Sequence, residues 1–131
     1  KENRSSCFGG FGKEFVVLAQ DRDIRKIEDM TSEQLAKVAE WCLLARDGQG
    51  ILDCDINAVQ SLFWGGENKP DATFRFCGVM PEGERMNNCF SELTRAASSY
   101  IDDPSYRQAL CERYPKPNKD ACLSSLLTNR I

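Results

Sequence analysis

The amino-acid sequence predicts a mainly α-helical domain that is stapled by disulfides and built from degenerate helix-loop-helix repeats. Three observations support this fold class: paired cysteines at a recurring spacing, a polar loop with glycine or proline inside each pair, and an amphipathic stretch after each pair. The chain has 131 residues, 41% hydrophobic and 28% charged, which is enough to bury one core. We expect residues 1–131 to form a single cysteine-rich domain of the secreted type.

The cysteines set the period of the repeat. Apart from Cys7 they fall into three sequence pairs with members 12, 12 and 11 residues apart, and successive pairs begin 35 and 34 residues apart. Cysteines at the facing ends of two helices can meet when the loop folds back. We therefore expect three local disulfides: Cys42–Cys54, Cys77–Cys89 and Cys111–Cys122.

Cys7 is then the odd cysteine. It is expected to be unpaired, or to bond to a partner protein or to a second chain in a disulfide-linked dimer. The alternative is that Cys7 joins the body of the domain and a cysteine on a helix face, such as Cys42, stays unpaired.

Capping signals place the helix boundaries. Thr31 and Gln34 form a capping box before an apolar helical face that includes Leu43, and Gly48 and Gly50 are expected to end that helix.

Further helices are expected after these signals. Asp55 is expected to cap the next helix, which the glycines after Trp64 would end, and Asn87 or Asn88 to open another. Asp103 followed by proline predicts a further start, and a last short helix carries Cys122 and the leucines after it.

Two segments allow a strand or a helix, namely residues 14–20 and 72–79. A lone short strand has no partner, so helix is favoured for both; if both are strands, the fold is α+β with a two-stranded ribbon. Residues 1–12 contain the glycine-rich stretch CFGGFG and are expected to form a flexible N-terminal arm.

Composition limits the cellular compartments and the classes of partner that fit this chain. A net charge of −3 argues against a nucleic-acid partner, and no apolar run is long enough to predict a membrane span. The seven cysteines lack the close spacing of zinc sites. They favour structural disulfides in a secreted protein, with the bacterial periplasm as the alternative. The start of the chain shows no signal-peptide pattern, so we take it as a mature or trimmed form.

The chain contains no histidine, which removes histidine-dependent acid–base, nucleophilic and metal chemistry. What remains for an enzyme is a carboxylate pair, a lysine or a tyrosine. The candidate pair is Asp53 and Asp55, for which helix capping is the simpler interpretation. We expect no metal, no cofactor and no catalysis. A small carboxylate-dependent hydrolase or toxin is the alternative.

Three aromatic residues are candidates for binding a protein partner: Trp41, Trp64 and Tyr100. Trp41 lies off the apolar face of its helix, and Trp64 stands beside two glycines. Tryptophan and tyrosine are enriched at binding hot spots, although packing in the core is the commoner fate of tryptophan.

The segment CGVMPEGERMNNCFSELTRAASSY, residues 77–100, resembles the signature of the bacterial lysozyme-inhibitor family LprI. The shared pattern is a cysteine, a spacer, Met-Asn, one more residue, a second cysteine and a helix. The chain is also similar in style to small secreted cysteine-rich effectors, periplasmic inhibitors and immunity proteins.

The predicted function is that of a secreted or periplasmic protein-binding module of the effector, inhibitor or immunity type. It would act through a surface patch without catalysis. A structural subunit of a larger assembly is a third interpretation.

Overall fold

The computed structural model describes residues 12, 15–20, 26–65 and 70–129, without the side chains of 64–65 and 126–129. Within these ranges the chain is helical, and no strand is present. Both ambiguous segments follow the favoured alternative, since residues 15–18 are helical and α4 spans Asp71–Gly78. The two-stranded ribbon is therefore absent from the described chain.

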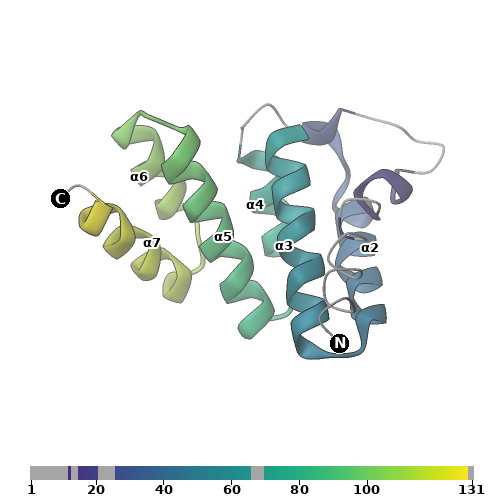
Figure 1. Ribbon diagram of the computed structural model, residues 1–131. Coiled ribbons are helices and arrows are strands. Elements are labelled where there is room, and N and C mark those ends of the chain that lie inside the picture. The colour runs from purple at the N-terminus through teal and green to yellow at the C-terminus, as the bar shows by residue number, and fades with distance from the viewer. Residues whose placement is uncertain (1–11, 13–14, 21–25, 66–69, 130–131) are drawn as a thin grey trace.

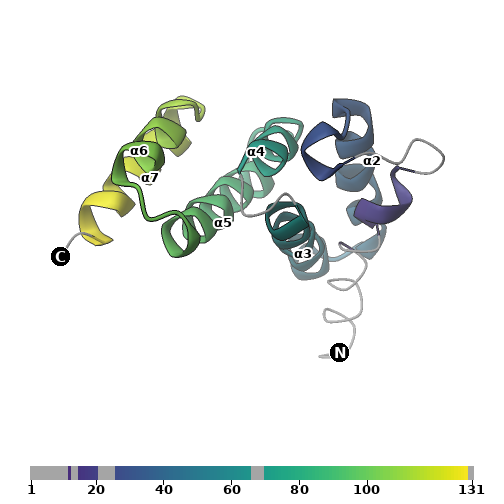
Figure 2. The same ribbon diagram turned by 90° about the horizontal axis from the view of Figure 1, so that it is seen from above.

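Three antiparallel helix pairs follow one another along the chain and form a row (Figures 1 and 2). The first hairpin is α2 (Ser32–Cys42) and α3 (Gly48–Gly65), the second is α4 and α5 (Glu84–Tyr100), and the third is α6 (Pro104–Glu112) and α7 (Lys116–Asn129). The second helices stack side by side, α3 on α5 and α5 on α7, while α2 packs on α4. This is the stacking expected of a short array of repeats.

Each hairpin contains one disulfide: Cys42–Cys54, Cys77–Cys89 and Cys111–Cys122. These are the three pairs that the spacing predicts, with Cα–Cα distances of 5.5, 5.4 and 5.5 Å. Each bond joins the end of the first helix to the second turn of the next, so it fixes where the two helices meet. Cys7 lies outside the described residues.

Two predicted helix starts are correct. The hydroxyl of Thr31 accepts a hydrogen bond from the amide of Gln34, whose side chain accepts one from the amide of Thr31, which completes the capping box of α2. Asp103 caps α6 by accepting from the amide of Ser105, with Pro104 at the first helical position.

The second helix of the first hairpin starts earlier than the sequence predicts. Asp55 does not cap α3; Asp47 does, by accepting a hydrogen bond from the amide of Gly50 at 2.8 Å. Arg46, with φ of 68°, makes the reversal, so Gly48 and Gly50 belong to α3 rather than ending α2. A Cβ on Gly50 would lie 3.1 Å from the Cβ of Ala45, which explains why glycine suits this close turn.

The same error recurs in the other hairpins. α5 is opened by Gly83 at φ of 131°, where glycine is favoured, and not by Asn87 or Asn88. α7 begins at Lys116 and is not a short final helix. The polar residues between the paired cysteines look like loop, but most of them form the first turns of the second helix.

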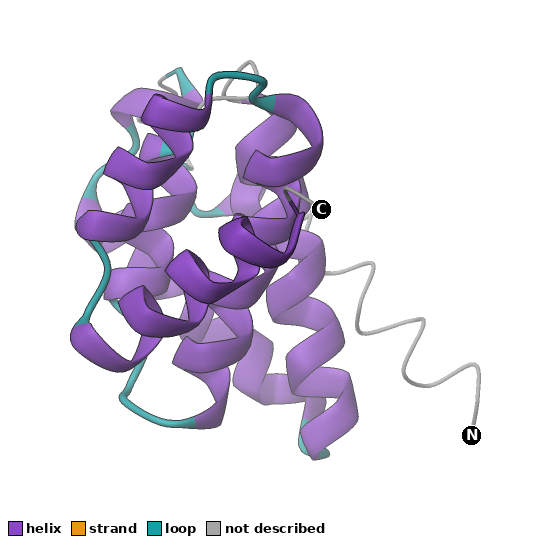
Figure 3. Ribbon diagram, turned by 90° about the vertical axis from the view of Figure 1, so that its left-hand side faces the viewer, coloured by secondary structure: helices purple, strands orange, loops and turns teal. Residues whose placement is uncertain are grey.

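The turn after the first helix of each hairpin buries an equivalent position of the repeat. The residue three positions after the first cysteine of each pair is buried in every hairpin, as Ala45, Met80 and Tyr114. Viewed from the end of the row, the third hairpin lies in front of the other two (Figure 3). The core is therefore continuous along the array, because each hairpin covers a face of its neighbour.

The segment before α2 covers the first hairpin. Val16 and Ala19 are buried, and an added Cβ on Gly12 would meet the backbone of α3 at Cys54 and Ala58. Residues 1–11 of the predicted arm lie outside the described chain, while Gly12 is buried against the body.

Candidate functional site: the groove between α5 and α7

A groove of about 400 Å³ lies between α5 and α7, where the second hairpin meets the third. Its α5 wall is formed by Asn87, Asn88, Phe90, Ser91 and Thr94. Its α7 wall is formed by Pro117, Asn118, Ala121, Cys122 and Ser125. The volume is within the range of small-molecule and cofactor sites, roughly 300–1,000 Å³.

Helical periodicity brings these residues together. Asn87, Ser91 and Thr94 follow one another at helical spacing and so share one face of α5. Asn118, Ala121 and Ser125 do the same on α7. All ten lining residues are uncharged, although 28% of the chain is charged.

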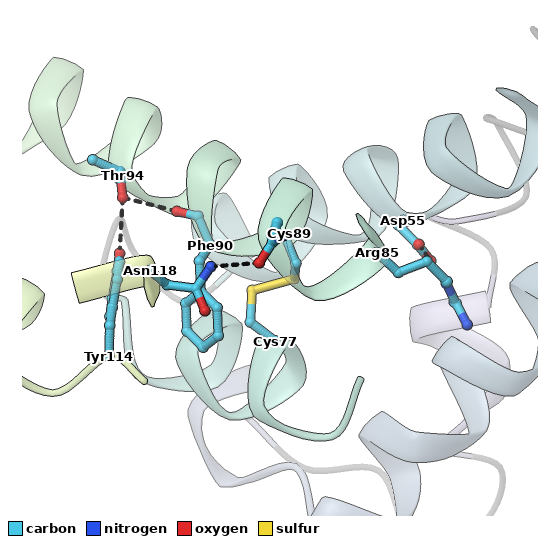
Figure 4. Close-up of a disulfide and its surroundings, with 9 residues drawn as sticks. Asp55, Cys77, Arg85, Cys89, Phe90, Thr94, Tyr114 and Asn118 are labelled. Carbon is cyan, nitrogen blue, oxygen red and sulfur yellow. Dashed lines mark hydrogen bonds and ion pairs between the residues drawn. A yellow bond between two sulfur atoms is a disulfide. The ribbon is translucent and has the colours of Figure 1, made fainter. Parts of the chain in front are cut away.

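A side-chain amide pair joins the two walls. Nδ2 of Asn118 donates to Oδ1 of Asn87 at 2.9 Å, a bond that Figure 4 draws as a dashed line from Asn118. Asn118 is almost fully buried. Each asparagine can make further hydrogen bonds through its second polar atom. No other hydrogen bond of these two side chains is found in the described part of the chain, so the described residues leave this capacity unused.

The hydroxyl of Thr94 organises the deep end of the groove. It donates to the carbonyl of Phe90 at 2.8 Å and lies 3.2 Å from the hydroxyl of Tyr114, as Figure 4 shows. Because the hydroxyl proton of Thr94 is used in the bond to the Phe90 carbonyl, the hydroxyl of Tyr114 is the donor in the bond between Tyr114 and Thr94. Burial raises the pKa of Tyr114 to about 12, against smaller lowering effects of Thr94 and the charge of Arg113.

We expect Tyr114 to limit stability in alkali. A folded-state pKa above the unfolded value of about 10 means that this contribution is complete below pH 10 and is lost as the pH rises through 12. A rapid pH jump followed by phenolate absorbance and helical circular dichroism should show one late ionisation coupled to loss of helix. Tyr114→Phe should lack that late step. Ionisation of every tyrosine near pH 10 with the helices intact would contradict the assignment.

The junction between the first and second hairpins is built differently. There Asp55 receives two hydrogen bonds from Arg85, at 2.7 and 2.8 Å, and Arg85 also donates to the carbonyl of Ala39 at 2.8 Å. Burial raises the pKa of Asp55 above its ordinary value, outweighing the hydrogen bonds and charge of Arg85. Arg85 and Asn118 each lie four residues before the second cysteine of their hairpin, so they occupy the same repeat position. This position makes the polar contact with the preceding hairpin at both junctions.

The structure does not assemble the predicted carboxylate pair. Asp53 and Asp55 are two residues apart on α3 and therefore point to different faces. Asp53 accepts a hydrogen bond from Gln49, while Asp55 is buried with Arg85. The pair that would carry the hydrolase alternative is thus split between a surface contact and a junction between hairpins.

Trp41 and Tyr100, two of the three predicted binding aromatics, do not lie together. Trp41 precedes the disulfide at the end of α2, is half-buried, and packs edge-on against Phe15 at 5.5 Å. Tyr100 ends α5 at the opposite end of the helices, is 51% exposed, and lies 6.1 Å from the ring of Phe63. The side chain of Trp64 lies outside the described residues. Their role in binding stays a prediction.

Leu43 was placed by helical periodicity on the apolar face of α2, and this prediction is wrong. α2 ends at Cys42, and the tighter turn η2 (Leu43–Ala45) turns both Leu43 and Leu44 toward the surface. After Cys42 the chain changes from an α-helix, with about 3.6 residues per turn, to a 3-10 helix, with about 3.0 residues per turn. This change moves Leu43 off the face that the α-helical spacing would bury.

The groove does not follow from the local sequence, because Asn87 and Asn88 have the character of a helix start and not of a binding face. Aligning the hairpins on their paired cysteines supplies the missing signal. In this alignment Asp55 of the first hairpin occupies the position of Phe90 in the second and Leu123 in the third. Asn118 of the third hairpin occupies the position of Arg85 in the second. A polar residue at a buried repeat position indicates a partner on the adjoining hairpin.

Within the described residues, no cluster of three or more cysteine or acidic side chains could hold a metal ion. None of the described helices combines the length and the apolar character needed to cross a membrane. Three disulfides are compatible with an extracellular or other oxidising compartment.

Comparisons with known protein families, with curated proteins and with solved structures find no match for this chain. The resemblance of residues 77–100 to the LprI family is thus not supported by a family match.

Proposed function

We propose that this protein is a binding module of an oxidising compartment, secreted or periplasmic, that holds a segment of another protein in the groove between α5 and α7. The observation that carries the proposal is the groove itself, which has hydrogen-bonding groups on both walls and a volume of about 400 Å³. Effector, inhibitor and immunity protein are all consistent with such binding without catalysis.

The position of the groove supports the proposal. It lies between two hairpins that are each closed by a disulfide, so its walls are held by elements of fixed internal geometry. A site that is already formed loses little conformational entropy on binding.

A peptide selection tests this function. The oxidised protein is used to enrich binders from a library of displayed random peptides, and synthetic copies are measured against Ala121→Trp. Ala121 is exposed in the groove, so the indole should fill the site without disturbing the core. We expect binding to weaken at least about tenfold, a change of about 1.4 kcal/mol.

The matched control is Ala109→Trp, because Ala109 is also exposed and helical but lies on α6 outside the groove lining. It should bind the peptides like the parent protein. Failure to enrich any peptide, or equal binding by both variants, would refute the groove as a protein-binding site.

A further inference from the structure

We propose that the groove recognises the backbone of an extended, uncharged peptide segment, with the amides of Asn87, Asn88 and Asn118 as its hydrogen-bonding partners. This inference rests on the proposed function and specifies the chemistry of the partner. Its test below can fail while the proposed function stands.

The dimensions of the walls set the length of the segment. From Asn87 to Thr94 along α5, and from Asn118 to Ser125 along α7, each wall rises by about 10 Å. An extended chain advances about 3.3 Å per residue, so the groove spans about three residues.

The amides match a peptide backbone in chemistry. An extended backbone presents N–H donors and C=O acceptors, and an asparagine side chain offers one group of each kind. The Asn87–Asn118 bond fixes both amides while using only one donor and one acceptor of the pair. The remaining Oδ1 of Asn118 and Nδ2 of Asn87 can therefore accept from and donate to the same peptide.

The absence of charge from the lining selects against charged segments. A charged side chain that loses water in the groove would meet no opposite charge among the ten lining residues. Two ion pairs involving these helices lie outside the lining, Arg95 with Glu92 at 2.8 Å and Lys119 with Glu112 at 3.2 Å. The lining thus fits small, uncharged side chains.

A backbone N-methyl scan tests the inference on synthetic peptides taken from the selection. Each residue of the bound segment is replaced in turn by its N-methyl form, which removes one N–H donor and keeps the side chain. We expect at least one position within the segment to lose at least about tenfold in affinity, and methylation outside the segment to have no effect. The enriched peptides should carry no charged residue within the segment.

Protein variants supply the complementary measurement. Asn88→Ala removes a groove amide for which no hydrogen bond to the described chain is found, so it should bind about fivefold more weakly with an unchanged melting temperature. Gln108→Ala removes an exposed amide on α6 and should bind normally.

Two outcomes would overturn the inference but leave the proposed function intact. The first is that N-methylation has no effect at any position of a peptide whose binding is still blocked by Ala121→Trp. The second is that a charged residue is required within the bound segment. Binding of neutral oligosaccharides at the groove, with no peptide bound, would remove both proposals together.

Discussion

Replacing Arg85 by methionine is expected to lower the free energy of unfolding by about 3–5 kcal/mol, because it leaves the carboxylate of Asp55 buried without its partner. The side chain of Asp55 is only 2% exposed, and both of its oxygens accept from Arg85. The same substitution removes the hydrogen bond to the carbonyl of Ala39, which ties α5 to α2. Urea unfolding of the oxidised protein measures the loss.

The pH dependence of this loss identifies its cause. Without Arg85, the pKa of buried Asp55 is raised further, since burial is already the dominant effect. A carboxyl pKa that is higher in the folded than in the unfolded state costs stability, and this cost grows as the pH rises above the unfolded-state pKa until it is complete at the folded-state pKa. The deficit of Arg85→Met relative to the parent protein should therefore be large at pH 7 and shrink toward pH 3.

A double variant separates the ion pair from the packing. Asp55→Leu combined with Arg85→Met places leucine where the equivalent repeat positions have Phe90 and Leu123. Replacing both partners of a buried pair by apolar residues is often neutral or stabilising, so most of the lost stability should return.

The exposed pair Arg95–Glu92 gives the control, because Arg95 is 60% exposed. Arg95→Met should change stability by less than about 1 kcal/mol. An Arg85→Met variant no less stable than Arg95→Met would contradict the role given to the buried pair.

Removing the central disulfide by Cys77→Ala and Cys89→Ala is expected to lower stability by about 3 kcal/mol, the chain-entropy value for a loop of this length. Alanine is used because both cysteines are buried. The second hairpin contacts both neighbours, so the whole array should unfold in a single transition at a lower urea concentration.

Removing Cys111–Cys122 should act locally instead. The third hairpin is at the end of the row and packs mainly through α7 on α5, so α6 and α7 should lose protection from hydrogen exchange before the rest. Peptide binding at the groove should weaken with it, since Cys122 lines the α7 wall. Uniform loss of protection in both disulfide variants would contradict this difference between central and terminal hairpins.

Local signals in the sequence were enough for the repeat and for the disulfides. The spacing of the paired cysteines depends only on the number of residues between them and on how far a helical hairpin can bring its ends together. It is therefore the same in repeats whose intervening residues differ. Thr31 with Gln34, and Asp103 with Pro104, mark helix starts through bonds to backbone within three residues. Such short-range interactions can be identified without knowledge of the rest of the fold.

Only the tertiary structure decided where the second helices begin and which polar residues are buried. The segments before Cys54, Cys89 and Cys122 are polar and contain glycine or proline, so local propensity assigns them to loops. They become helix because the stacked hairpins bury one face of their first turns. Arg85 and Asn118 stand on that face, and their partners, Asp55 and Asn87, come from the preceding hairpin about 30 residues earlier.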